Sequence, residues 1–377
     1  MARVLVGMSG GVDSSVAAAL LARAGHEVIG VSLQIYDHSA SGRTARCCSP
    51  ADFLDARRVA DRFGFRYYVL NREEAFTSRV LDDFVDEYLR GRTPNPCVRC
   101  NAEVKFETLA ALARDLDAQA IATGHYARLS DDETTGERWL LRARDRDKDQ
   151  SYFLFDLTPE QIRLAIFPLG EMTKDDVRAM ARELGLGTAD KPDSQDVCFV
   201  EGGDYRGFVS ARMAQRGLSE DEGEMLDAVG NAIGRHRGLS HYTIGQRRGL
   251  GVAASRRLYV IGIDPAANTV RLGSEEDLAC RSLRLTRVRF HGATPHGGFE
   301  TLVKARYRHP GIRGWVTPDD RGGAQIDLCE DLRGAAPGQA AVFYDGDRVL
   351  GGGWIEADMP TGTAHETRLS EAAPARS

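Results

Sequence analysis

Two cysteines about a hundred residues apart are the side chains of this 377-residue chain best suited to covalent chemistry. Cys100 closes a polar segment, residues 91–100 (GRTPNPCVRC), whose two prolines restrict the backbone and present a thiol on a loop. Cys198 lies in a second loop, residues 193–199 (DSQDVCF). A thiolate beside a cation such as Arg99 is expected to have a lowered pKa and to be more reactive. Movement of one loop would then bring two reactive thiols together.

Each cysteine also has a simpler interpretation. For Cys100 and Cys198 this is a pair of inert, buried thiols, which are common, but the segment around Cys100 is too polar for a core strand. Seven cysteines in a chain without an export signal indicate thiol or metal chemistry and not a disulfide framework. Cys47 and Cys48 are expected in an arginine-flanked surface loop, with metal binding as the second interpretation. Cys280 and Cys329 adjoin β-type runs and are expected to be packing residues.

Residues 8–15 (MSGGVDSS) have the composition of a phosphate-binding loop. They follow the apolar run RVLVGM and open a stretch of helical composition, so small residues would let backbone N–H groups approach an anion at a helix N-terminus. The loop has neither the lysine of a Walker A motif nor the G-x-G-x-x-G spacing, which disfavours ordinary kinase or motor chemistry. A serine- and glycine-rich turn that only caps a helix is the alternative.

Alternating strands and helices are expected to position these groups. The segments are strand-type runs at 3–8, 28–33, 66–70 and 119–123, and helical runs at 14–24, from 49–50 onward, at 73–89 and at 103–115. This order predicts a parallel, doubly wound sheet, in which ligands bind beyond the carboxyl ends of the strands. Thr173 is expected to cap a further helix that Gly185 and Gly187 end.

The second half of the chain lacks this alternation of strand-type and helical runs. Residues 217–227 carry five acids and no base, which is typical of a surface or linker segment. Beyond residue 281, short β-type runs separated by Gly, Pro and Asp predict a small antiparallel barrel or sandwich. Residues from 360 onward are polar and alanine-rich and are expected to form a frayed tail.

The net charge of −6 argues against a generic nucleic-acid coat, but it is an average. Residues 234–259 hold six arginines and no acid, and residues 281–314 hold seven arginines and one lysine against one glutamate. With one arginine and four acids between them, residues 234–314 carry a net charge of +10, which leaves −16 for the rest. Ordinary surface arginines are the alternative to a stripe that neutralises RNA phosphates.

No run approaches the ~18 apolar residues of a membrane span, and no signal-peptide pattern opens the chain. We therefore expect a soluble, cytoplasmic protein that acts as a monomer. At about 150 residues per domain, the length predicts two or three domains.

The loop at residues 9–14 (SGGVDS) resembles the PP-loop ATP pyrophosphatases, which adenylate a carbonyl oxygen and release pyrophosphate. Seven ordered motifs over residues 1–357 are similar to the tRNA-specific 2-thiouridylase family: SGGVDSS, GRTPNPxxxCN, ATGHYAR, KDQSYFL, DSxxxCF, HYTIGQRRGL and PGQAAVFY. The resemblance implies ATP-dependent transfer of sulfur to C2 of the wobble uridine of tRNA. It also implies an α/β Rossmann-like PP-loop domain with a parallel sheet at 1–205, a small central tRNA-contacting domain at 206–278, an antiparallel β-barrel at 279–360 and a disordered tail at 361–377.

The resemblance assigns roles to individual residues. The ATP site would comprise Gly7, Met8, Ser9, Gly10, Gly11, Val12, Asp13, Ser14, Leu33 and Gly124, with Asp13 helping to hold Mg²⁺. The tRNA contacts would comprise Asn95, Pro96, Cys97, His125, Lys148, Asp149, Gln150, Arg306, Tyr307 and Gln339.

In the implied relay, Cys198 carries a persulfide that a sulfur-donor protein or cysteine desulfurase supplies, and Cys100 releases its sulfur with formation of a disulfide. Some members of the family carry an aspartate where this chain has Cys97. Cys97, Cys100 and Cys198 together also form a three-thiolate set, able to hold a [4Fe–4S] cluster with an open iron, or zinc. Spacing does not choose between relay and cluster.

Two rival functions remain open at this stage. An amidating enzyme such as argininosuccinate synthase shares SGGxDS but needs neither the paired cysteines nor the basic stripe. A non-catalytic RNA-binding protein that senses nucleotide would need no reactive thiol.

Overall fold

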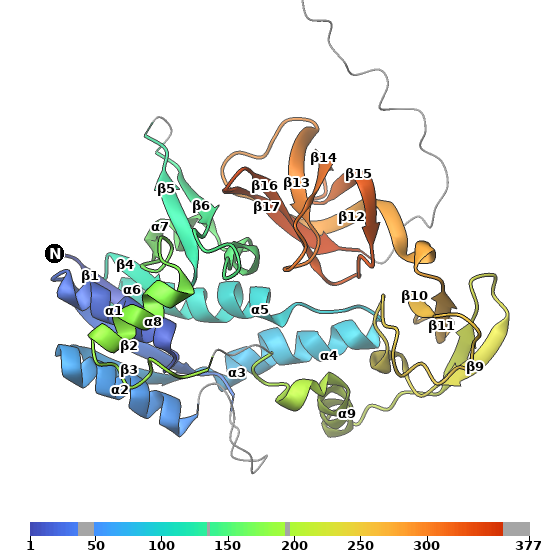
Figure 1. Cartoon of the computed structure of the whole chain (residues 1–377), viewed down its shortest axis with the longest axis horizontal. Helices are drawn as coiled ribbons and strands as arrows, with labels where there is room; N and C mark the ends of the chain where they lie inside the picture. Colours follow the sequence, from blue (N-terminus) through green and yellow to red (C-terminus); the bar gives the residue numbers. More distant parts are fainter. Residues whose placement is uncertain (37–48, 134–135, 193–196, 357–377) are drawn as a thin grey trace, which may run out of the picture.

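The computed structural model describes residues 1–36, 49–133, 136–192 and 197–356. A parallel sheet with its helices lies at one end of the molecule and a small sheet at the other (Figure 1). Helices α4 (Asp82–Leu89) and α5 (Pro96–Arg99) run between them, and a β-barrel lies above these helices in the same view. The predictions for Cys47, Cys48 and the segment from 360 fall outside the described residues.

The predicted parallel sheet is confirmed. Its strand order is β3-β2-β1-β4-β7, and every pairing within it is parallel. The strands are β1 (Arg3–Gly7), β2 (Glu27–Gln34), β3 (Arg66–Asn71), β4 (Ala120–Thr123) and β7 (Ala165–Ile166). In this register Gly7 lies between Val31 and Thr123, so the ends of β1, β2 and β4 meet at one edge.

Helices cover both faces of this sheet because β1 alternates its buried side chains between them. Val4 and Val6 pack with the helices of one face, and Leu5 packs with α6 on the other. The helices are α1 (Val12–Arg23), α2 (Pro50–Phe63) and α8 (Lys174–Glu183) on the first face and α6 (Glu107–Asp115) on the second. Ser49 and Thr173 close the capping boxes of α2 and α8, as predicted for both starts.

Short helices form the middle of the molecule. They are α3 (Glu73–Phe76), α4, α5, α7 (Pro159–Leu164), α9 (Tyr205–Gln215), the π-helical segments η2 (Thr77–Leu81) and η3 (Cys100–Phe106), and the 3₁₀ turns η4 (Ser151–Leu154), η5 (Glu201–Gly203), η6 (Leu239–His241) and η7 (Glu276–Leu278). Val209 and Met213 of α9 pack on Phe84 and Val85 of α4. None of the helices in the described part of the chain is long and apolar enough to cross a membrane.

A second, smaller sheet follows α9. Its order is β10-β11-β8-β9, made of β8 (Gly223–Leu226), β9 (Ala232–His236), β10 (Tyr259–Asp264) and β11 (Thr269–Gly273). Strand β8 lies within the acid-rich segment 217–227, which is therefore only partly a connection.

The last sheet settles the choice between barrel and sandwich. Six antiparallel strands close on themselves through the β12–β17 pairing. They are β12 (Ala279–Phe290), β13 (Phe299–Lys304), β14 (Ile312–Pro318), β15 (Ala324–Arg333), β16 (Ala340–Asp345) and β17 (Arg348–Ile355), and the hairpin β5 (Ala127–Asp131)–β6 (Arg138–Arg142) adjoins β17. The packing role predicted for Cys329 is wrong, since β15 turns it outward and leaves it exposed.

Candidate functional site

The loop between β1 and α1 is held open by its own small residues. Gly10 has a φ of +72°, which side chains rarely tolerate, and a Cβ there would lie 2.3 Å from the carbonyl oxygen of Asp52. The Oγ of Ser14 accepts from the N–H of Ser9 at 3.1 Å. Gly11 is the N-cap of α1 and offers no side chain to its first turn. The helix N-terminus therefore faces the loop without a capping side chain, as an anion site requires.

The end of β4 closes one side of this loop. A Cβ on Gly124 would lie 2.6 Å from the backbone nitrogen of Ser14, so only glycine fits between β4 and α1. Leu33, near the end of β2, pairs with Leu70 and packs partly buried beside Ile35. All ten predicted ATP-binding residues thus lie at the edge where β1, β2 and β4 end.

Asp13 is held by two residues that sequence reasoning missed. The Nζ of Lys174 donates to both carboxylate oxygens of Asp13 at 2.8 Å, and the hydroxyl of Tyr126 donates to Oδ1 at 2.8 Å. Lys174 is buried at the start of α8, 161 residues from Asp13 in the sequence. The sequence placed Lys174 only in the first turn of a helix after a capping threonine. That position indicates a helix start and gives no sign of a contact with Asp13.

A second lysine reaches the same loop. The Nζ of Lys191 donates to the carbonyl oxygen of Gly10 at 2.9 Å and pairs with Asp52 at 2.5 Å and Asp55 at 3.0 Å. These two carboxylates hold the pKa of Lys191 above its usual value against the effect of burial, which is the largest single influence on it. Lys191 thereby ties the glycine loop to α2 and to the segment that leads to Cys198.

His125 follows the sheet edge directly. Its Nδ1 lies 2.8 Å from Oγ1 of Thr123, and its ring lies near those of Phe106 and Phe167. Burial, together with the nearby ammonium of Lys105, lowers the pKa of His125 to about 3. The imidazole is therefore neutral near pH 7 and contacts RNA, if at all, as a neutral donor or acceptor.

Replacing His125 by Gln is expected to flatten the pH dependence of unfolding below pH 6.5. In the window from 6.5 down to about 3, the unfolded chain binds a proton on His125 that the folded chain does not. As the pH is lowered through this window, the unfolding free energy therefore decreases, by about 1.4 kcal/mol per pH unit from this group. Urea unfolding across this window measures the slope, with His296→Gln at an exposed position as control. Equal slopes in wild type and His125→Gln would refute the burial argument.

The two predicted catalytic cysteines belong to one apolar cluster. Cys100 is a buried member of it, and the half-buried Cys198 packs against it with Phe199. Ile35 and Leu33, at the end of β2, belong to the same packing unit. The fold thus brings both cysteines to the end of a strand that borders the nucleotide loop.

Cys97 lies exposed on α5, one turn before Cys100. Within the ranges that the structure describes, no three His, Cys, Asp or Glu side chains gather closely enough to hold a metal ion. The thiols of Cys97, Cys100 and Cys198 are accordingly not arranged as a ligand set.

Arg99 has partners other than those the sequence suggested. It pairs with Asp83 at 2.9 Å and Glu103 at 3.4 Å, and its guanidinium lies over the ring of Trp354 at 5.5 Å. These contacts join α5 to α4 and to the barrel. The predicted effect of Arg99 on a thiol pKa stays a prediction.

The barrel also makes hydrogen bonds to Thr93 and Pro94, which precede Cys97 and Cys100. The Nε2 of Gln339 donates to the carbonyl oxygens of Thr93 and Pro94 at 3.0 Å, and the N–H of Thr93 donates to Pro337 at 2.7 Å. Asn95 and Pro96 are buried below these contacts, which leaves Cys97 as the exposed member of the predicted Asn95–Pro96–Cys97 set. In this structure Gln339 positions the cysteine segment.

Two of the side chains at 148–150 accept hydrogen bonds within the protein. The Asp149 carboxylate is buried and accepts from Arg142 at 3.1 Å and from the N–H of Ala143 at 3.0 Å, so it supports the segment from within. The Oε1 of Gln150 accepts from the N–H of Tyr126 at 2.9 Å. Lys148 is half-buried. Their contacts to tRNA stay predictions.

Arg306 and Tyr307 come from the barrel side. The ring centroid of Tyr307 lies 4.5 Å from that of Phe153, and Arg306 is exposed and donates to the carbonyl of Arg333 at 2.8 Å. The nucleotide edge, the cysteine cluster and these barrel residues therefore line adjoining parts of the molecule.

The basic stripe is a surface feature. All six arginines between residues 234 and 259 are exposed, on and around β9 and the segment before β10: Arg235, Arg237, Arg247, Arg248, Arg256 and Arg257. Within the described residues, Arg235 pairs with Glu222 at 3.6 Å, a contact between exposed groups that screens little.

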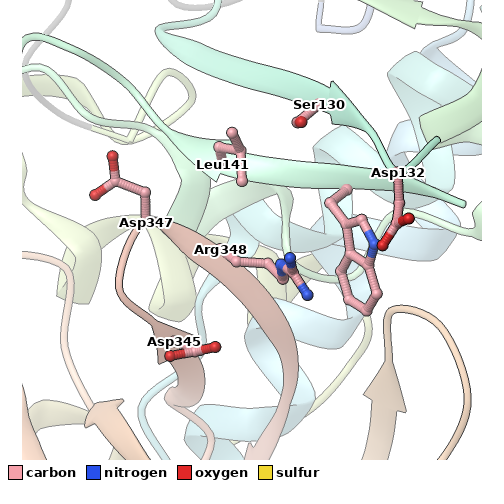
Figure 2. A pocket seen from close by; sticks show the side chains of 7 residues that line it. Ser130, Asp132, Leu141, Asp345, Asp347 and Arg348 are labelled. Carbon is pink, nitrogen blue, oxygen red and sulfur yellow. The ribbon is translucent and has the colours of Figure 1, made fainter. Parts of the chain in front are cut away.

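A cleft of about 410 Å³ lies elsewhere, where the β5–β6 hairpin meets the turn from β16 to β17. Figure 2 shows Asp345 at the end of β16, Asp347 on that turn and Asp132 directly after β5. None of the predicted site residues lines this cleft. Its carboxylates make it unsuitable for a phosphate or an RNA backbone.

Comparisons with known proteins agree along most of the chain. Residues 2–202 match the model described as a tRNA methyl transferase HUP domain, residues 212–274 a tRNA methyl transferase PRC-barrel domain, and residues 280–355 an aminomethyltransferase beta-barrel domain. The chain is 49% identical to the tRNA-specific 2-thiouridylase MnmA of Geobacter metallireducens, over 96% of this chain and 98% of that protein. It is 48% identical to the protein of the same name from Geotalea uraniireducens (96% and 97% covered) and 47% identical to that from Rhodospirillum centenum (94% and 91%).

Proposed function

Because this chain belongs to the tRNA-specific 2-thiouridylase family, we propose that it replaces the C2 oxygen of the wobble uridine in tRNA by sulfur, at the expense of ATP. The observation that carries the proposal is the packing of Cys100 and Cys198 in one cluster with the end of β2, beside the nucleotide loop.

ATP is consumed because the oxygen on C2 is a poor leaving group. The uridine O2 attacks the α-phosphorus of ATP, pyrophosphate leaves, and the oxygen becomes part of an AMP leaving group. The loop between β1 and α1 fits a polyphosphate, since its glycines leave room where a Cβ would collide and α1 opens onto it without a side-chain cap. Asp13 supplies a carboxylate for Mg²⁺ at the same place.

Sulfur transfer then uses both thiols. The terminal sulfur of a Cys198 persulfide attacks C2, and AMP leaves. The Cys100 thiolate then attacks Sγ of Cys198, and a Cys100–Cys198 disulfide forms. The bond between Sγ of Cys198 and the sulfur on C2 breaks, and the sulfur on C2 takes its electron pair. A thiol reductant resets the pair. We favour this relay over an iron–sulfur cluster because the three thiols are not gathered as ligands.

The tRNA is proposed to lie with its anticodon arm between the basic stripe and the cysteine segment. An anticodon loop is already single-stranded, so presenting the base costs less than extrusion from a duplex. A sulfur-donor protein, a monomeric enzyme and a cytoplasmic location remain parts of the proposal.

Reversing two stripe charges, as in Arg247→Glu/Arg248→Glu, is expected to weaken tRNA binding about ten-fold or more at moderate salt and to lower the salt dependence, because fewer phosphates are neutralised. Filter binding at several salt concentrations measures both. Nucleotide binding is expected to be unchanged, and Arg321→Glu, an exposed arginine outside the stripe, serves as control. Unchanged tRNA affinity would place the RNA elsewhere.

Nucleoside mass spectrometry tests the function itself. Purified protein is incubated with tRNA, Mg-ATP and a persulfide source, and 2-thiouridine is expected only when ATP is present. A methylated nucleoside, as the family-model descriptions suggest, has a different mass and would overturn the assignment.

A further inference from the structure

The nucleotide loop carries no cation of its own. From residue 4 to residue 22 the only charged side chain is Asp13, an acid. A loop of neutral residues and one carboxylate must nevertheless bind a strongly anionic triphosphate and stabilise pyrophosphate as it leaves. Backbone N–H groups and the α1 dipole contribute only partial charges.

The fold brings two ammonium groups to this loop from elsewhere, and each of them is also paired with carboxylates. Lys174 comes from the start of α8 and holds Asp13 with both oxygens at 2.8 Å. Lys191 comes from the segment after α8 and lies 2.9 Å from the carbonyl oxygen of Gly10. The two ammonium groups thus touch opposite ends of the Gly10–Asp13 turn.

The use of lysine in this chain is selective. Five of its 49 basic residues are lysines and 44 are arginines. None of the five lysines is exposed, whereas the six basic residues between 234 and 259 are exposed arginines. Lysine differs from arginine in offering a compact point charge with three N–H donors, a form suited to phosphate. Two of five lysines at one loop therefore indicate a requirement for that charge.

We propose that Lys174 is the phosphate-binding cation of the nucleotide site and supplies the charge that other ATP-binding loops carry within the loop itself. Three donors allow Lys174 to hold Asp13 and a phosphate oxygen together. Lys191 is a positioning residue, because its three donors hold the Gly10 carbonyl, Asp52 and Asp55 and thereby fix the Gly10 side of the turn. This inference rests on the proposed nucleotide site.

Binding of two nucleotides tests it. The probes are the Mg²⁺ complex of α,β-methylene-ATP, which cannot be cleaved between the α- and β-phosphates, and AMP, which lacks the outer phosphates. Lys174→Met and Lys191→Met are each expected to weaken the ATP analogue about ten-fold or more and to leave AMP within about two-fold. The first variant loses a charge-assisted hydrogen bond to the outer phosphates, and the second loosens the turn on which these phosphates lie.

Arg182→Met is the matched control, because Arg182 is an exposed cation on α8 that pairs with Asp190. If Lys174→Met fails to fold in a melting experiment, Lys191→Met decides, since its side chain is 30% exposed. Equal losses for AMP and the analogue, or no loss for either, would overturn the inference. Failure of the wild type to bind the analogue would instead overturn the proposed nucleotide site.

Discussion

The Cys198→Ser protein is expected to bind tRNA and Mg-ATP like the wild type and to form at least about 10³-fold less 2-thiouridine, because a serine hydroxyl cannot carry a sulfane sulfur. Nucleoside mass spectrometry measures the product, and filter binding measures tRNA affinity. Retained thiolation would overturn the assignment of Cys198.

Cys100→Ser separates the two thiols. The variant is expected to load Cys198 and to attack the uridine, but not to release the product, since no thiol remains to take Sγ of Cys198. Mass spectrometry of the unreduced protein should then find a Cys198–tRNA adduct. Cys329→Ser is the control, because this thiol is exposed on the barrel. An active, iron-containing protein after anaerobic purification would favour the cluster instead.

The second large effect is expected for Gly124→Ala. A Cβ there lies 2.6 Å from the Ser14 nitrogen and 2.8 Å from the Asp13 carbonyl carbon, both backbone atoms that cannot turn aside. Strand β4 and helix α1 must separate, which moves the phosphate-binding N–H groups. Displacement on the order of 1 Å costs about 10²-fold in rate, so pyrophosphate release should fall by that factor while tRNA binding persists.

Gly187→Ala is the matched control for this variant. Nothing lies within 4 Å of a Cβ at Gly187, which follows α8. Its pyrophosphate release should equal that of the wild type. Normal release by Gly124→Ala would show that the contact between β4 and α1 is not needed for adenylation.

Local patterns were sufficient wherever the physics is local. Capping by Ser49 and Thr173 depends on a side chain and the N–H three residues later, so the starts of α2 and α8 were predictable. The parallel sheet followed from alternating strands and helices. Cys329 shows the limit, since a run of β-type residues does not reveal which face of a strand will be buried.

Charge partners were beyond the reach of the sequence. The loop motif contains Asp13 but gives no sign that Lys174 and Tyr126 hold it, because these residues lie 161 and 113 positions away. In the same way the sequence does not reveal that Arg99 pairs with Asp83. The energy of an ion pair depends on the distance between the two charges in the folded chain, and the residues next to each charge in the sequence do not determine that distance.

The sequence by itself determined the loop chemistry, the two thiols and the +10 stripe, because backbone conformation, nucleophilicity and local charge belong to short segments. Only the tertiary structure decided that Cys100 and Cys198 share one cluster and that Gln339 of the barrel holds the cysteine segment. It also decided that two lysines contact the loop between β1 and α1. Each of these depends on segments that meet only when the sheet, helices and barrel pack together, since burial of their apolar faces sets the distances.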